Sequence, residues 1–88
     1  LEAWFIAGIE SLRGQRGIRN DAVSPDDPEA IQDAKGWLTR HMINGYTYVE
    51  VDDQPALIAT FDYAAAAPGS RSLRKFLADV KRLGQELI

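Results

Sequence analysis

The sequence predicts a mainly α-helical fold, a small bundle of about four helices with one short extended segment. Apolar residues recur three or four positions apart in the opening stretch and again near the end of the chain, which is typical of helices that bury one face. Pro28 and Pro55 each follow an aspartate closely, an arrangement that favours the start of a helix. We expect residues 1–88 to form one small domain or, because Leu1 opens within an apolar pattern, a piece of a larger protein.

The first helix is predicted over residues 1–13. Its broad apolar face recurs at helical spacing and consists of Leu1, Trp4, Phe5, Ile9 and Leu12, with Ile6 beside them. This is the most apolar stretch of the chain, so we expect the other helices to cover it. Gly14 ends the helix, and Gly17 keeps the following loop flexible.

A second helix is predicted over residues 28–43. Asp27 is its expected cap, and Pro28 is its first residue. Its apolar stripe consists of Ile31, Ala34, Leu38 and Met42. Gly36 indicates close packing against a neighbour, and Asn44-Gly45 is expected to end the helix as a left-handed cap.

Two interpretations are open for residues 46–61. Residues 46–53 are rich in β-formers, which suggests a short strand that turns back onto residues 56–61 as a hairpin. The alternative is a helix over 55–66 that Asp53 caps, and the alanine run near its end favours this helix. The apolar residues on one face of that helix are Leu57, Ile58 and Phe61.

The last helix is predicted over residues 71–87, after a cap at Ser70. Its apolar stripe consists of Leu73, Phe76, Leu77, Val80, Leu83 and Leu87, with basic residues on the opposite face. We expect it to dock on the first helix, with Trp4, Phe5 and Ile9 packing against Phe76, Leu77 and Val80. Replacing Phe76 with alanine is then expected to cost about 3–5 kcal/mol.

Charge is unevenly distributed along a chain whose net charge is −3. An acidic block lies within residues 21–33 and a basic block within 71–82. Such blocks more often make two helices soluble, or let them face each other, than bind nucleic acid. The absence of cysteine excludes disulfides, thiol nucleophiles and Cys-ligated zinc. No apolar run is long enough to span a bilayer and no signal peptide is visible, so we expect a cytoplasmic protein without a membrane partner.

Arg13, Arg16 and Arg19 are the candidate phosphate-binding residues. They are separated by glycines in a loop, where guanidinium groups and bare backbone amides can contact a phosphate. A solvated turn at the end of a helix, where arginine offsets the helix dipole, explains the same pattern.

A chemical and a structural interpretation are open both for the acids Glu50 and Asp52 and for His41. Glu50 and Asp52 would point the same way on a strand and could share a metal ion, but exposed acids on a strand edge explain them as well. His41 is the only histidine and a candidate general base, yet no nucleophile or second ligand lies at a telling spacing. A position at the edge of a buried helix face is the better interpretation of His41.

Several short motifs resemble a family of uncharacterised bacterial proteins with a distant similarity to the TOPRIM (topoisomerase–primase) fold. Glu2-Ala-Trp-Phe-Ile-Ala7, followed by Glu10-Ser-Leu-Arg13, resembles the family signature E-x-W-F-L-A-D…E-A-L-R. Similarities continue in the same order with Pro28, Ala34-Lys35-x-x-Leu38, Tyr48, Leu57-Ile-Ala-x-Phe-Asp62 and Pro68-x-Ser-x-Ser-Leu-Arg-Lys-Phe-Leu77. The resemblance implies that this chain is the C-terminal half of a larger α/β TOPRIM-like protein. Gly8 stands where the signature has aspartate.

The resemblance also implies a function for the full-length protein. In TOPRIM-type enzymes a glutamate and an Asp-x-Asp pair hold magnesium for phosphodiester chemistry, and here the Asp-x-Asp is expected upstream. Glu2 maps onto a metal-side carboxylate and is the candidate catalytic residue, although the first turn of a helix also favours an acid. The implied protein is a metal-dependent nuclease or phosphotransfer protein of a bacterial phage-defence type that acts on nucleic acid beside an ATPase. Residues 1–88 alone are expected to be inactive and to hold no cofactor. The alternative is a non-catalytic helical module that binds a protein partner through an apolar groove.

Overall fold

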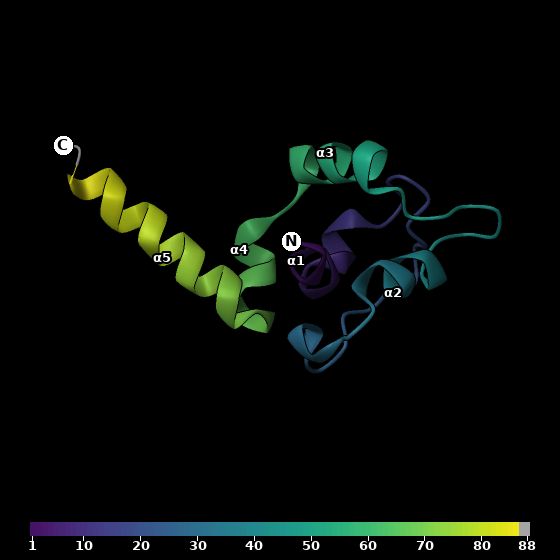
Figure 1. Ribbon diagram of the computed structural model, residues 1–88, viewed down its shortest axis with the longest axis horizontal. Coiled ribbons are helices and arrows are strands. Elements are labelled where there is room, and N and C mark those ends of the chain that lie inside the picture. Colours follow the sequence, from purple (N-terminus) through teal and green to yellow (C-terminus); the bar gives the residue numbers. More distant parts are fainter. Residues whose placement is uncertain (87–88) are drawn as a thin grey trace.

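The computed structural model describes residues 1–86, and it confirms the predicted mainly helical fold class (Figure 1). The described residues form five α-helices and three short 3-10 helices. In chain order these are α1 (Glu2–Ala7), η1 (Ile9–Leu12), η2 (Pro28–Ala30), α2 (Ala34–Arg40), α3 (Glu50–Thr60), α4 (Tyr63–Ala66), η3 (Ala67–Gly69) and α5 (Arg71–Glu86). An isolated antiparallel bridge between Ile18 and Met42 joins the loop after η1 to the loop after α2.

The opening stretch lies at the centre of the core, as its apolar pattern predicts. Its fully buried side chains are Phe5, Ile6, Ile9 and Leu12. The predicted continuous helix is interrupted at Gly8, which separates α1 from η1. A Cβ at position 8 would lie 2.8 Å from both the Ala66 Cβ and the Phe61 Cε1. Glycine at this position therefore lets α4 and the Phe61 ring pack directly against the interruption.

The helix predicted over 28–43 is shorter than expected. Pro28 starts only η2, and the Asp27 side chain does not cap it. α2 begins after Asp33, whose Oδ1 accepts a hydrogen bond from the Gly36 N–H at 3.0 Å. A Cβ at Gly36 would collide with this capping carboxylate, so the glycine accommodates the cap and not a neighbouring helix.

The turn at Gly45 lies in the loop beyond α2 and does not cap that helix. Gly45 has a φ of 94°, and the turn closes with a hydrogen bond of 3.1 Å from the Tyr46 N–H to the Ile43 carbonyl. The expected extended segment is correspondingly short, because α3 already begins at Glu50.

For residues 46–61, the helical interpretation is correct and the hairpin is wrong. α3 begins at Glu50 and contains Pro55 in its interior, although the sequence predicts a start at Pro55. Proline has no backbone N–H, so the Val51 carbonyl loses its hydrogen bond within the helix. Val51 is exposed, and water can replace this bond. Asp53 therefore does not precede the helix as the cap that the sequence predicts. It is buried within α3, and its Oδ2 accepts a hydrogen bond of 2.7 Å from the Val49 N–H.

The helix predicted over 55–66 is also interrupted. α3 ends at Thr60, because the next residue, Phe61, has extended backbone angles. Asp62 then caps α4 by accepting a hydrogen bond of 3.0 Å from the Ala65 N–H. The interruption turns the Phe61 ring edge-on to the Phe5 ring, with 5.4 Å between the ring centroids.

α5 projects away from the rest of the molecule (Figure 1), and this differs from the predicted docking along α1. Leu73 is fully buried, and the Phe76 ring contacts Trp4 with 5.1 Å between ring centroids. Leu77 is partly buried and packs against the core, as predicted. Phe76, Val80 and Leu83 are 45%, 49% and 52% exposed, so most of the stripe faces solvent. Val80 is therefore not buried in the predicted interface, and the predicted Leu87 lies outside the described residues.

Polar contacts at the first turn set the direction of α5. Glu29 Oε1 accepts hydrogen bonds of 2.7 Å from both the Ser70 hydroxyl and the Ser72 N–H. The Trp4 Nε1 donates to the Ser72 Oγ at 2.9 Å. These bonds attach the start of α5 to η2 and α1, and the Arg74 guanidinium donates to carbonyl groups of η3. The later turns then extend beyond the body, which explains why the packing predicted from the stripe does not form.

Candidate functional site

Glu2 lies where the starts of α1 and α3 meet. Its Oε2 accepts a hydrogen bond of 2.9 Å from the Tyr48 hydroxyl and another of 2.9 Å from the Gln54 Nε2. Tyr48 is buried, and its N–H donates to the Thr39 Oγ1 in α2 at 3.0 Å. The carboxylate is therefore held in one orientation by residues about fifty positions further along the chain.

The hydrogen bonds determine the charge state of this pair. Partial burial raises the pKa of the Glu2 carboxyl. The bonds from Tyr48 and Gln54, together with the N-terminal charge and a backbone hydrogen bond, lower it more, so its pKa lies below the ordinary value. Burial and the adjacent carboxylate of Glu2 raise the pKa of the Tyr48 hydroxyl. At neutral pH the pair consists of an ionised acceptor and a neutral donor.

An ion pair between Lys35 and Glu50 lies near Glu2. Lys35 Nζ in α2 contacts Glu50 Oε2 at 2.7 Å, and the hydrogen bond and charge of Glu50 raise the pKa of Lys35, with a smaller contribution from Glu2. The positive charge beside the carboxylates of Glu2 and Glu50 is therefore the ammonium group of Lys35. Together Glu2, Lys35, Tyr48, Glu50 and Gln54 make a polar cluster at the first turns of three helices, which we call the Glu2 cluster.

The Glu2 cluster does not fit a divalent metal ion on its own. Glu2 Oε2 already accepts two hydrogen bonds, and Glu50 is paired with Lys35. Within residues 1–86 no three His, Asp or Glu side chains gather closely enough to hold a metal ion. Any magnesium site that used Glu2 would need its other ligands from outside these residues.

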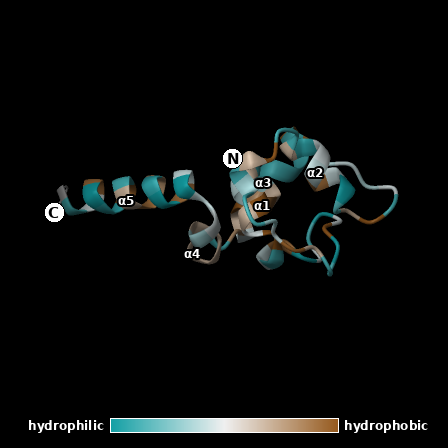
Figure 2. Ribbon diagram, turned by 90° about the horizontal axis from the view of Figure 1, so that it is seen from below, coloured by the Kyte–Doolittle hydropathy of each residue, from teal (hydrophilic) through white to brown (hydrophobic). Residues whose placement is uncertain are grey.

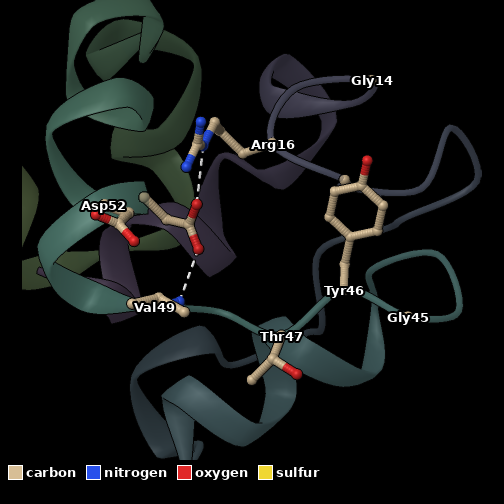
Figure 3. Close-up of a pocket in the computed structure, with 9 residues that line it drawn as sticks. Gly14, Arg16, Gly45, Tyr46, Thr47, Val49 and Asp52 are labelled. Carbon is tan, nitrogen blue, oxygen red and sulfur yellow. Dashed lines mark hydrogen bonds and ion pairs between the residues drawn. The ribbon is translucent and has the colours of Figure 1, made fainter.

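The suggested Glu50–Asp52 metal pair is wrong because both residues lie on α3. Side chains two positions apart on a helix diverge by about 200°, so they do not converge as they would on a strand. Glu50 pairs with Lys35, whereas Asp52 lines a groove on another side of the helix (Figure 3).

The three candidate arginines have different surroundings. Arg13 Nε donates to the Ala22 carbonyl at 2.8 Å, which ties two parts of the loop together. Arg16 Nε contacts Asp53 Oδ1 at 2.8 Å, and Arg19 Nη2 contacts Asp21 Oδ2 at 2.6 Å. Arg16 and Arg19 line separate grooves. The structure therefore does not gather the three guanidinium groups around one phosphate.

The groove beside Arg16 has a volume of about 610 Å³ (Figure 3). It lies between the loop of residues 13–19, which we call the glycine-rich loop, and the start of α3. Arg16 has a φ of 50° and places its guanidinium against the buried Asp53. Asp52 also lines the groove, so its ionisable side chains carry one positive and two negative charges. On the other side the Tyr46 ring packs against the backbone of Gly17. The charge of this groove disfavours a phosphate.

A second groove, of about 460 Å³, lies beside the Ile18–Met42 bridge. Its lining consists of Arg19, Arg40, Met42, Ile43 and Asn44. It contains two arginines and no carboxylate. Sequence patterns gave no sign that Arg40 belongs with the glycine-rich loop, because only the backbone bridge brings the two segments together.

His41 occupies the edge of a buried face, in agreement with its structural interpretation. Its ring stacks on Trp37 with 3.7 Å between centroids, and its Nδ1 lies 2.7 Å from the Trp37 carbonyl oxygen. Stacking and this hydrogen bond fix the ring within α2.

Lys35, Tyr48 and Gln54 were not predicted as partners of Glu2. Lys35 and Tyr48 occur among the positions that resemble the bacterial family, and that is the one signal in the sequence that marks them. Gln54 has no such signal, because a polar side chain in a helix has no preferred partner that spacing alone can reveal.

No known protein family, curated protein or solved structure matches the chain. None of the helices within residues 1–86 is long and apolar enough to cross a membrane. The resemblance to the TOPRIM-like bacterial family stays a prediction.

Proposed function

We propose that this chain is a protein-interaction module whose docking element is α5. The observation that carries the proposal is the apolar stripe that α5 leaves uncovered beyond its first turns (Figure 2). Phe76, Val80 and Leu83 follow the buried Leu73 at spacings of three, four and three residues. This spacing is the seam by which one helix packs against another. An uncovered seam of this kind is typical of a helix that binds a partner helix.

The charge of α5 identifies the chemistry of the partner. Residues 71–86 include five basic and two acidic residues, a net charge of +3, whereas residues 1–70 include five basic and eleven acidic residues, a net charge of −6. Two copies of α5 would repel each other through this net charge. The basic residues lie on the face opposite the stripe, so they attract a partner through the net charge of the helix and not through contacts beside the seam. We therefore assign the stripe to a different protein helix that has an apolar seam and a net negative charge.

A designed peptide tests this assignment. The probe is a helical peptide with leucine at the seam positions and glutamate at its exposed positions, and the matched peptide carries lysine in place of glutamate. Trp4 contacts Phe76, so binding at the stripe should change tryptophan emission. We expect saturable binding of the glutamate peptide that weakens with salt, and much weaker binding of the lysine peptide.

The control variant carries Val80→Asp and Leu83→Asp. Both side chains are half exposed, so the variant should unfold at nearly the same temperature as the parent. Loss of peptide binding in this variant supports the stripe as the docking surface. Equal binding by the variant, or equal binding of both peptides, contradicts the proposal.

A second candidate function is favoured by the orientation of Glu2. In this proposal the chain is the helical C-terminal part of a TOPRIM-like, magnesium-dependent nuclease or phosphotransfer protein of bacterial defence, working beside an ATPase. What supports it is the carboxylate that Tyr48 and Gln54 hold ionised, at the position that resembles the family signature. The parent's upstream sequence is the test: a strand that ends in Asp-x-Asp supports this candidate, and its absence favours the interaction module.

A further inference from the structure

The two grooves beside the Ile18–Met42 bridge differ in charge. The groove in Figure 3 combines Arg16 with Asp52 and Asp53, so its own carboxylates already neutralise the cation. The second groove combines Arg19 and Arg40 with the neutral amide of Asn44 and contains no acid in its lining. Of the two, the second groove has the excess positive charge that attracts an anion.

Backbone hydrogen bonds hold the second groove together. The Arg19 N–H donates to the His41 carbonyl at 2.9 Å, and the Ile43 N–H donates to the Gly17 carbonyl at 2.9 Å. These bonds place Arg19, from the glycine-rich loop, beside the last residue of α2, Arg40. The two guanidinium groups thus come from segments that are distant in sequence but fixed to each other.

Both arginines can contact a ligand. Arg40 has no ion-pair partner among the side chains of residues 1–85. Arg19 pairs with Asp21, but their side chains are 47% and 68% exposed, and such surface pairs contribute little. A ligand with two negative oxygens can therefore displace Asp21 from Arg19.

We propose that the groove between Arg19 and Arg40 binds a phosphate group. Guanidinium groups present paired N–H donors whose geometry matches phosphate oxygens, and the Asn44 amide adds a neutral donor. Met42 and Ile43 supply an apolar wall of the groove, which limits competition from water. This assignment differs from the sequence-based expectation, since it replaces Arg13 and Arg16 with Arg40. It is independent of the docking role of α5.

The test is a titration of the ¹⁵N-labelled protein followed through its backbone amide signals. Inorganic pyrophosphate and a short oligothymidylate are the two probes, because the phosphate could come from a small molecule or from a nucleic-acid backbone. We expect saturable shifts at Asn44 and Arg40. The Arg40→Gln variant should bind at least about tenfold more weakly, because it loses a charge-assisted hydrogen bond.

Two further variants distinguish a built site from general surface charge. Asp21→Asn removes the carboxylate that competes for Arg19, so it should bind a few-fold more tightly. Arg71→Gln removes the same charge as Arg40→Gln from an exposed position on α5 and should leave the affinity unchanged. Equal weakening by Arg71→Gln and Arg40→Gln, or shifts at Asn44 that do not saturate, overturns the proposal.

The two probes identify the source of the phosphate. Binding of pyrophosphate alone supports a small phosphate ligand. Binding of oligothymidylate whose affinity falls with salt supports a nucleic-acid backbone, and the Arg19→Gln, Arg40→Gln double variant should then flatten the slope of log K against log salt by about 1.4. Absence of saturable binding by both probes overturns the site.

Discussion

Glu2 and Asp53 are two carboxylates that connect distant parts of the chain. Glu2 is bonded to Tyr48, 46 residues away, and Asp53 is paired with Arg16, 37 residues away. Asp53 also accepts the N–H that precedes α3, so its removal would leave a backbone donor without its acceptor. Single polar residues thus fix the loops around the core, in addition to the apolar contacts of the opening stretch.

The Glu2–Tyr48 bond predicts how stability changes with pH. The pKa of Glu2 is lowered in the folded state, so its contribution is present above its ordinary value and is lost as the pH falls through the folded pKa. The pKa of Tyr48 is raised, so its contribution is present below about pH 10 and is lost at higher pH. Tyr48→Phe should reduce both losses, by roughly 0.5–1 kcal/mol on the acid side because Glu2 is only partly buried.

Urea unfolding at pH 3, 5, 7, 9 and 11 measures this effect. Tyr46→Phe is the matched control, because Tyr46 is exposed and its hydroxyl has no part in the Glu2 cluster. The control should follow the parent at every pH. A Tyr48→Phe variant with the same pH profile as the parent would show that the hydrogen bond does not control the titration of Glu2.

At the scale of helices, sequence periodicity locates the helical regions but not their interruptions. It correctly places the core in the opening stretch, because burial of an apolar face leaves a repeat of three and four residues. The break at Gly8 depends on how closely Phe61 and Ala66 approach, which is a tertiary contact without a local signal. The early start of α3 places Asp53 inside the helix, where it pairs with Arg16 from a distant part of the chain. The same limit applies to the candidate site: motifs mark Glu2, Lys35 and Tyr48, but nothing in the sequence shows that these side chains meet.

Leu73 and Leu83 give a matched test of how α5 is attached. They lie in the same helix, yet Leu73 is fully buried and Leu83 is 52% exposed. Leu73→Ala should cost about 2–5 kcal/mol in the free energy of unfolding, whereas Leu83→Ala should stay within about 0.5–1 kcal/mol. Phe76→Ala should cost roughly 1–2 kcal/mol, less than its sequence pattern predicts, because only part of its ring is covered.

Chemical denaturation of the three variants measures these differences. The change of leucine to alanine affects helix propensity equally at both positions, so the contrast reports on burial alone. A cost for Leu83→Ala as large as that for Leu73→Ala would mean that α5 folds back onto the body in solution.

At the scale of the whole molecule, an acidic body carries a basic helical arm. The charge blocks are visible in the sequence, where they indicate either helices that are made soluble or helices that face each other. In the structure the acidic block reaches the arm at its base, where Glu29 accepts hydrogen bonds from Ser70 and Ser72. The direction of the arm was not predictable, because an amphipathic stripe specifies that a helix needs a cover but does not specify which surface covers it.

The arrangement of acids leads to an expectation about activity. Purified residues 1–88 should not cleave nucleic acid with magnesium or manganese. Phosphodiester hydrolysis by metal ions needs carboxylates that clamp the metal around the reacting phosphate, whereas the Glu2 cluster offers one carboxylate beside a Lys35–Glu50 pair. The measurement is cleavage of an end-labelled oligonucleotide with each metal, with Glu2→Gln protein purified in parallel to identify contaminating nucleases. Cleavage that requires metal and disappears in Glu2→Gln would overturn both the TOPRIM-like assignment and the interpretation of this chain as an inactive piece of a larger enzyme, since a contaminant would be equally active in both preparations.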